Sequence, residues 1–205
     1  MYWVEIEGVR LPRRIAGDVA LDFCNTLAGW NESPRNRRDW LDDYDRMARW
    51  AEYGGLVTAE DGARLRRMAK RRRADAEAAL QRARRLRESL QRAVTEPSDV
   101  HALRVVSTFA REAASHGVLV PDGDGARWQL RRSAGIAQPV LAVARAAESF
   151  LVDANLAEVK ACPGAGCGWL FVDSSGRRRW CSMADCGNRA KVAAFAARNR
   201  RARLS

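Results

Sequence analysis

The spacing of apolar residues along the first 158 positions predicts a mostly helical chain. Apolar side chains recur there at intervals of three and four residues, which places them on one face of a helix. The segments with this pattern are 18–30, 39–53, 58–94, 98–117 and 136–155. The segment 58–94 is expected to break near Ala74, because the run of arginines before it contains no apolar residue.

Local residue types predict how these elements begin, end and connect. Thr58 is followed three residues later by Asp61, the pattern of a capping box at a helix start. Two β-prone runs, 118–120 and 127–130, flank a turn rich in Gly and Asp, which is typical of a β-hairpin. A short strand is expected within 4–11.

Four of the five cysteines form two close pairs near the C-terminus. Cys162 and Cys167 are separated by four residues, Cys181 and Cys186 by four more, and thirteen residues lie between the pairs. Zinc prefers four tetrahedral ligands, and four thiolates leave no position for water, so we expect one structural zinc ion. The alternatives are disulfides or plain buried thiols. The fifth, Cys24, is expected to be a buried free thiol.

The residues around these cysteines predict a small module of their own. Residues 168–172 read as a strand, 173–176 as a turn and 177–180 as a return strand. Ser182 is expected to cap a final helix whose first turn holds Cys186. The fold class is therefore mainly α: a helical N-terminal domain (1–158) with a small β-hairpin, followed by a C-terminal treble-clef-like zinc finger (159–205).

The net charge of +11 is unevenly distributed. Residues 160–205 carry a net charge of +8 and residues 59–94 carry +7, so the remainder is slightly acidic. The basic face of 59–94 is either a second phosphate contact, an exposed flank of a dimer or simply solvated. The sequence has no run of 18 apolar residues and no signal-peptide pattern, so we expect no membrane partner and a cytoplasmic location.

The basic C-terminal module suggests a nucleic-acid interface. A basic helix fits the major groove, where amides and guanidinium groups read base edges and other cations hold phosphates. We expect Asn188 and Arg189 to read bases, and Val192, Phe195 and Ala196 to pack inward. The full set of candidate nucleic-acid residues is Arg177, Arg178, Arg179, Asn188, Arg189, Lys191, Arg198 and Arg201.

Other roles remain open for several of these residues. Asn188 could brace the zinc loop, and Arg189 could pair with Asp185. The aromatic residues Trp169, Phe171 and Trp180 could stack unpaired bases, which would favour RNA, or pack around the metal.

A candidate ligand site lies in the first predicted helix. Asp22, Asn25 and Thr26 share one face beside an apolar stripe, an arrangement that suits a small-molecule pocket. The alternative is that Asp22 and Asn25 bond neighbouring backbone or an arginine such as Arg13. Only two histidines occur, with no nucleophile arrangement around them, so the sequence does not predict an enzyme.

Three stretches resemble known families. The string CSMADCGNRAKVAAFAARNR resembles the CGNR zinc finger, and GDVALDFCNTL and ARRLRESL resemble the ABATE domain that commonly precedes it. The resemblance implies a bacterial stress-induced transcription regulator whose finger binds DNA. A regulator needs an input, so we expect the N-terminal domain to sense a small-molecule effector or to form a homodimer. The alternatives are an RNA- or ribosome-associated zinc protein, or a protein-interaction module with a structural zinc.

Overall fold

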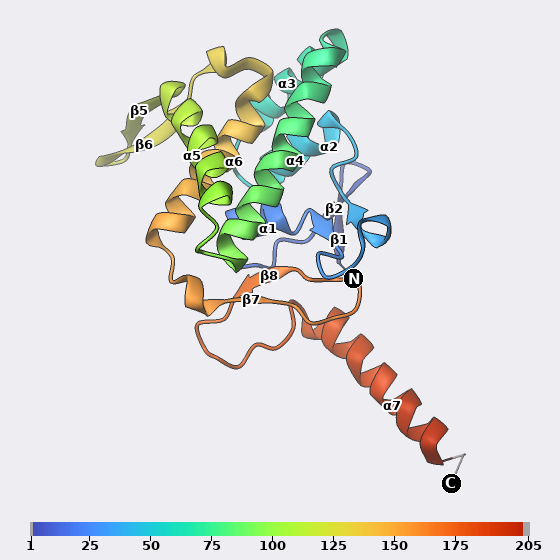
Figure 1. The fold of residues 1–205 in the computed structure, drawn as a ribbon. Helices are drawn as coiled ribbons and strands as arrows, with labels where there is room; N and C mark the ends of the chain where they lie inside the picture. The colour runs from blue at the N-terminus through green and yellow to red at the C-terminus, as the bar shows by residue number, and fades with distance from the viewer. Residues whose placement is uncertain (1, 203–205) are drawn as a thin grey trace. The chain divides into compact units, whose positions relative to one another are not determined.

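The computed structural model describes residues 2–202, without the side chains of residues 201 and 202 (Figure 1). The chain packs into two compact units. One unit combines residues 1–39 with residues 157–205, and the other is Trp40–Leu156. The described residues contain seven α-helices and four separate two-stranded sheets. The predicted fold class, mainly α with small hairpins and a C-terminal cysteine cluster, is therefore confirmed.

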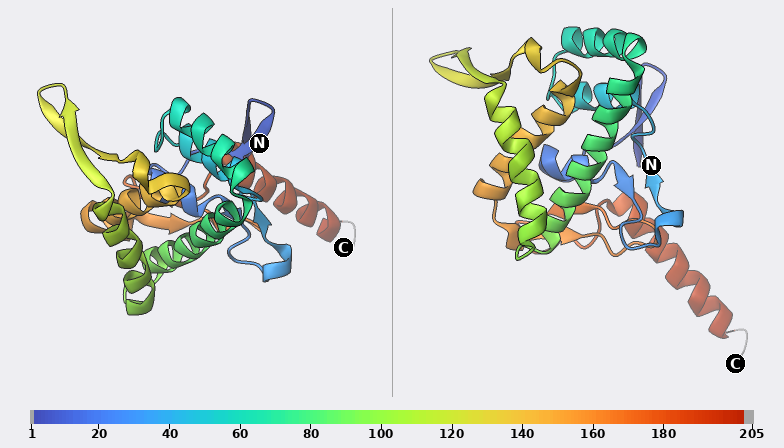
Figure 2. Two further views of the ribbon diagram at one scale, coloured as in Figure 1. Left: turned by 90° about the horizontal axis from the view of Figure 1, so that it is seen from above. Right: turned by 45° about the horizontal axis from the view of Figure 1, so that its top comes forward.

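The unit Trp40–Leu156 is a helical bundle with one hairpin. Figures 1 and 2 show α4, α5 and α6 side by side, with the β5–β6 hairpin standing out from them. Its core contains Leu86, Leu90, Phe109 and Leu141, all almost fully buried. The elements are α2 (Tyr44–Tyr53), α3 (Ala59–Arg71), α4 (Arg73–Thr95), α5 (Val100–Ser115), β5 (Gly117–Asp122), β6 (Gly125–Leu130) and α6 (Gln138–Asp153).

Helix boundaries in this unit follow the capping residues. The Thr58 hydroxyl accepts a hydrogen bond from the Asp61 N–H at 3.2 Å, so the predicted start of α3 is confirmed. The predicted break in the long basic segment occurs at Arg72. The expected helix start at 39 is wrong, because Asp43 caps α2 by accepting from Arg46 N–H at 2.8 Å. The predicted hairpin forms, with Val120 opposite Arg127 in the register.

Many arginines of the basic segment 59–94 are bound to partners within this unit. Arg87 is buried, and the Arg84 guanidinium donates to the Leu41 carbonyl at 2.8 Å. Others form ion pairs: Arg64 with Asp61, Arg66 with Glu52, Arg72 with Asp75 and Arg82 with Glu112. Several cations of this segment therefore already have partners within the same unit.

One stretch of this unit meets the length and hydropathy requirements of a membrane span. It is Arg132–Asp153, and half of its apolar window is buried inside the fold. This is weak evidence for a membrane, because a buried core helix meets the same requirements. No other helix in residues 2–202 meets them.

The unit formed by the two chain ends is built from short elements. Its N-terminal part contains β1 (Trp3–Ile6), β2 (Val9–Pro12), α1 (Val19–Cys24), β3 (Leu27–Ala28) and β4 (Arg38–Asp39), and its C-terminal part contains β7 (Val159–Ala161), β8 (Leu170–Val172) and α7 (Asn188–Ala202). The strand expected within 4–11 is a hairpin, whose turn uses the left-handed backbone of Glu7 and Gly8. Helix α1 is shorter than predicted, because Leu27 already pairs with Asp39 in a small sheet.

The strand pairing inside the finger differs from the prediction. Strand β8 pairs with β7, placing Phe171 opposite Lys160, and residues 177–180 form no strand. The reason lies in the Asp173 carboxylate, which accepts hydrogen bonds from Ser175 Oγ, Lys160 Nζ and the Arg178 N–H. The turn at 173–176 is therefore held by the Asp173 side chain. The residues after it turn away from β8 and do not pair with it.

Residues 1–39 hold the finger through long-range hydrogen bonds. The Asn25 amide donates to the Leu170 carbonyl and accepts from the Leu170 N–H, both at 2.8 Å. The Val172 N–H donates to the Ala16 carbonyl at 2.8 Å, and the Gly29 N–H donates to the Cys167 carbonyl at 2.7 Å. This packing joins segments that the sequence assigns to different domains, so the compact units differ from the predicted division after residue 158.

Candidate metal centre and nucleic-acid interface

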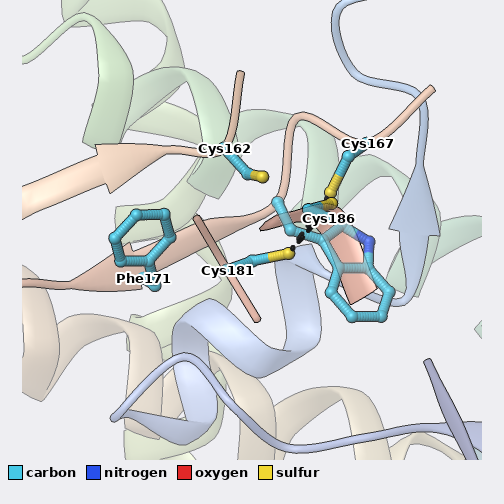
Figure 3. Packing of buried hydrophobic residues seen from close by; sticks show 6 residues of the cluster. Cys162, Cys167, Phe171, Cys181 and Cys186 are labelled. Carbon is cyan, nitrogen blue, oxygen red and sulfur yellow. Dashed lines mark hydrogen bonds between the residues drawn. The ribbon is translucent and has the colours of Figure 1, made fainter. Parts of the chain in front are cut away.

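The four paired cysteines meet at one buried point. Their sulfur atoms all lie within 4.8 Å of one another, and each residue is at most 2% exposed. The Sγ atom of Cys181 lies 3.6 Å from that of Cys167 and 3.5 Å from that of Cys186. Figure 3 shows the labelled sulfurs directed toward one another, with Phe171 packed nearby. All four thiols are free, so the disulfide alternative is excluded.

These distances fit a tetrahedral zinc ion. Zinc–sulfur bonds of about 2.3 Å place tetrahedral sulfurs about 3.8 Å apart, close to the observed separations, whereas a disulfide needs about 2.05 Å. The first loop fits closely around the cluster, since a Cβ at Gly164 would lie 2.8 Å from Cys186 Sγ. The cysteines therefore form a site for one structural zinc ion.

The four thiols strongly perturb one another's pKa values. Hydrogen bonds from the other thiols, that of Cys162 foremost, lower the pKa of Cys186 far below its usual value. Contacts with Cys162 also raise the pKa of Cys167 and of Cys181. Four thiolates this close repel one another, and a divalent cation is the charge that lets all four ionise together.

Two side chains approach Cys186 from outside the ligand set. The Tyr2 hydroxyl lies 3.1 Å from its Sγ, and an Arg189 Nη donates to the same sulfur at 3.3 Å. The Arg189 guanidinium also lies over the Tyr2 ring, 4.9 Å from its centroid. Such outer contacts orient a ligand and offset the negative charge of a tetrathiolate site. Arg189, predicted to read bases, thus contacts a zinc ligand.

The polar cluster at the C-terminal end of α1, formed by Asp22, Asn25 and Thr26, has structural partners. Asp22, Asn25 and Thr26 are at most 5% exposed. The Asp22 carboxylate accepts from the N–H groups of Ile15 and Ala16, both at 2.9 Å, and Thr26 Oγ1 donates to the Phe23 carbonyl. Burial raises the pKa of Asp22, although those backbone bonds oppose the shift. The contacts of Asp22 and Asn25 support the alternative that they bond backbone, with Arg14 rather than Arg13 as the nearby cation.

Among the three consecutive arginines 177–179, which form the arginine triplet, one side chain points inward and two point outward. The Arg178 guanidinium stacks on Phe171 at 4.4 Å and donates to the carbonyls of Ile15, at 2.7 Å, and Cys181, at 2.5 Å. Arg177 and Arg179 are exposed. The sequence correctly placed Arg178 on the face opposite its neighbours, but it did not predict that this face is internal.

A cationic hollow lies beside the triplet. Its volume is about 470 Å³, and it is lined by Lys160, Ala161, Pro163, Gly176 and the three arginines Arg177, Arg178 and Arg179. Lys160 was not among the predicted residues, because nothing in the local sequence places β7 beside the triplet. Four cations line the hollow, but the Lys160 ammonium is paired with Asp173 and the Arg178 guanidinium with backbone carbonyls, so Arg177 and Arg179 are the exposed cations that suit a phosphate group.

Helix α7 presents an exposed surface. Between Lys191 and Arg200 every residue except the half-buried Ala197 is exposed. Val192 and Phe195 are 60% and 59% exposed, so the prediction that they pack inward is wrong. Asn188 is also exposed. Arg201 lies in α7, but its side chain is outside the described residues.

The comparisons with known proteins match both parts of the chain. A family model named ABATE, described as "Putative stress-induced transcription regulator", matches residues 17–154. The CGNR zinc finger model matches residues 158–199, the stretch that contains all four ligand cysteines. No curated protein matches the chain.

Proposed function

Because the chain belongs to the ABATE family of stress-induced transcription regulators and carries a CGNR zinc finger, we propose that it is a DNA-binding regulator that contacts duplex DNA through residues 157–205. The observation that carries the proposal is the exposed cationic surface built directly on the cysteine cluster. The zinc ion takes no chemical part: it holds Cys162, Cys167, Cys181 and Cys186, and it supplies folding free energy to a segment with little core of its own.

Five exposed cations form the proposed phosphate contacts. They are Arg177 and Arg179 beside the hollow, and Lys191, Arg198 and Arg200 on α7. Neutralising about five phosphates predicts that log K falls with log salt at a slope near −4.5. Arg178 and Lys160 are left out of this set, because the Arg178 guanidinium is bound to backbone carbonyls and the Lys160 ammonium is paired with Asp173.

RNA binding by base stacking is less well supported. Trp169 and Phe171 are at most 1% exposed, and the Trp169 indole donates to the Leu27 carbonyl at 3.1 Å. Their ring faces are therefore covered by protein. Trp180 remains partly exposed, with Arg179 lying 5.2 Å from its ring centroid. One partly covered aromatic residue is a small platform for stacking unpaired bases.

The larger unit is proposed to receive a regulatory ligand, in place of the polar cluster at the C-terminal end of α1. A cavity of about 490 Å³ opens there between α3, α6 and β6, within the size range of small-molecule sites. Its lining includes the buried Asp61 and Gln138 together with Trp128 and Arg145. A metabolite mixture that raises the melting temperature of the wild type, but not of Trp128→Ala, would identify this site.

The proposal has three further parts. We propose that the chain forms a homodimer, that it has no enzymatic role and that it is located in the cytoplasm.

The test is selection of bound duplexes from a random pool, with and without a zinc chelator. The proposal expects an enriched motif that disappears on chelation, and a salt slope near −4.5. The double variant Arg177→Ala/Arg179→Ala should weaken binding to all duplexes and reduce the slope by about two. Equal binding of an unrelated RNA duplex, or no binding by zinc-loaded protein, would contradict it.

A further inference from the structure

Helix α7 carries an unpartnered face whose composition differs from the cationic surface around it. At 3.6 residues per turn, Asn188, Val192, Phe195, Ala196 and Asn199 fall within a sector about 100° wide. All five are exposed. Two amides thus lie at the ends of one stripe, with the two large apolar side chains of the helix between them.

Cations border this stripe on both sides. Lys191 and Arg198 lie along one edge, and Arg200 lies along the other, at about 80° from Val192. Arg189 shares the second edge near the cysteine cluster, where it contacts Cys186. The sequence of α7 contains no acidic residue, so the whole helix surface is complementary to a polyanion.

We infer that α7 lies in the major groove of DNA with this stripe toward the base edges, and that it reads adenine–thymine pairs. The inference rests on the proposed function. Asparagine bonds the N6 and N7 edge of adenine, and apolar side chains contact the thymine methyl group. The bordering cations then face the phosphates on either side of a groove about 12 Å wide.

The length of the stripe sets the number of base pairs. Asn188 and Asn199 are eleven residues apart, about 16 Å along a helix axis, which corresponds to about five base pairs. Val192 and Phe195 lie between them. The structure assigns Asn199, Val192 and Phe195 to specificity, and leaves Lys191, Arg198 and Arg200 to phosphate contacts that do not depend on sequence.

A membrane surface is the other polyanion that an apolar stripe bordered by cations could meet. Interfacial helices bury a broad apolar face rich in Trp, Phe and Leu. Here only Val192 and Phe195 are large and apolar, and Asn199 shares their stripe. The small apolar area and the amides within the stripe favour base edges over lipid.

The experiment uses the zinc-loaded full chain and its selected duplex, with each thymine replaced in turn by uracil, which removes only the methyl group. Loss of one buried methyl contact should weaken wild-type binding about fourfold. Val192→Ala or Phe195→Ala should abolish that difference at one position. Asn199→Ala should lower affinity about tenfold and relax the preference at one adenine. Ala194→Ser, on the opposite side of α7, is the matched control and should change nothing.

The outcomes separate this inference from the proposed function. A selected motif that is lost on chelation, but is insensitive to uracil and to the three stripe variants, overturns the inference and leaves the proposed function intact. Failure to bind any duplex overturns both. Binding to vesicles of phosphatidylserine and phosphatidylcholine that depends on Phe195, without a duplex preference, overturns the inference in favour of a lipid surface.

Discussion

Replacing Asn25 with alanine tests whether the polar cluster at the C-terminal end of α1 holds the finger in place. The Asn25 amide is fully buried and makes two hydrogen bonds of 2.8 Å to the backbone of Leu170, 145 residues away. Asn25→Ala removes both bonds and leaves the Leu170 N–H and carbonyl without these partners inside the protein. Each buried unpaired group costs about 1–3 kcal/mol, so the expected loss is about 2–6 kcal/mol.

The assay is guanidinium denaturation of zinc-loaded protein, followed by circular dichroism and by release of zinc to a colorimetric chelator. Zinc should leave Asn25→Ala at a lower denaturant concentration, because Leu170 lies between the two cysteine pairs. Asn31→Ala is the matched control: it removes one bond of 3.2 Å to the Gly164 carbonyl and should cost about 1 kcal/mol. An Asn25→Ala protein within about 0.5 kcal/mol of wild type would refute the reasoning, since one unmade buried hydrogen bond already costs more.

Four further predictions concern the finger. Chelation should unfold it, because structural zinc contributes on the order of 10–16 kcal/mol of apparent binding free energy, and loss of near-ultraviolet circular dichroism should accompany metal removal. Arg178→Ala should promote zinc release on denaturation, whereas Arg177→Ala should leave stability unchanged and weaken only duplex binding; the reverse pattern would contradict the inward placement of Arg178. Gly164→Ala should reduce zinc affinity in a competition titration, because its Cβ would lie 2.8 Å from a ligand sulfur. A hydrogen bond from Lys160 lowers the pKa of Asp173 to about 2, below the usual value of about 3.9. The stabilisation that the ionised Asp173 gives to the folded state should therefore be present above about pH 4 and be lost as the pH falls toward about 2. The stability of Asp173→Asn, measured over the same pH range, should lack this pH-dependent loss.

The local features of the finger were predictable, but the partners of its segments were not. The cysteine spacing predicted the metal cluster, since each pair is close in sequence and two pairs suffice for four ligands. The alternation of the triplet predicted that Arg178 faces away from Arg177 and Arg179. Nothing local indicated that β8 pairs with β7, because that choice depends on how Asp173 bonds Lys160 and the Arg178 N–H once all three are brought together.

By itself, the sequence determined the mainly helical class, the start of α3 at Thr58, the hairpin β5–β6 and the set of four metal ligands. These features depend on periodicity, caps and spacing over a few residues. Only the tertiary structure decided that Asn25 supports Leu170, that Lys160 joins the cationic hollow, and that α7 exposes Val192 and Phe195. Each of these features depends on whether residues distant in sequence come into contact. Such contacts, and the burial and hydrogen bonds that they bring, form only when the chain folds.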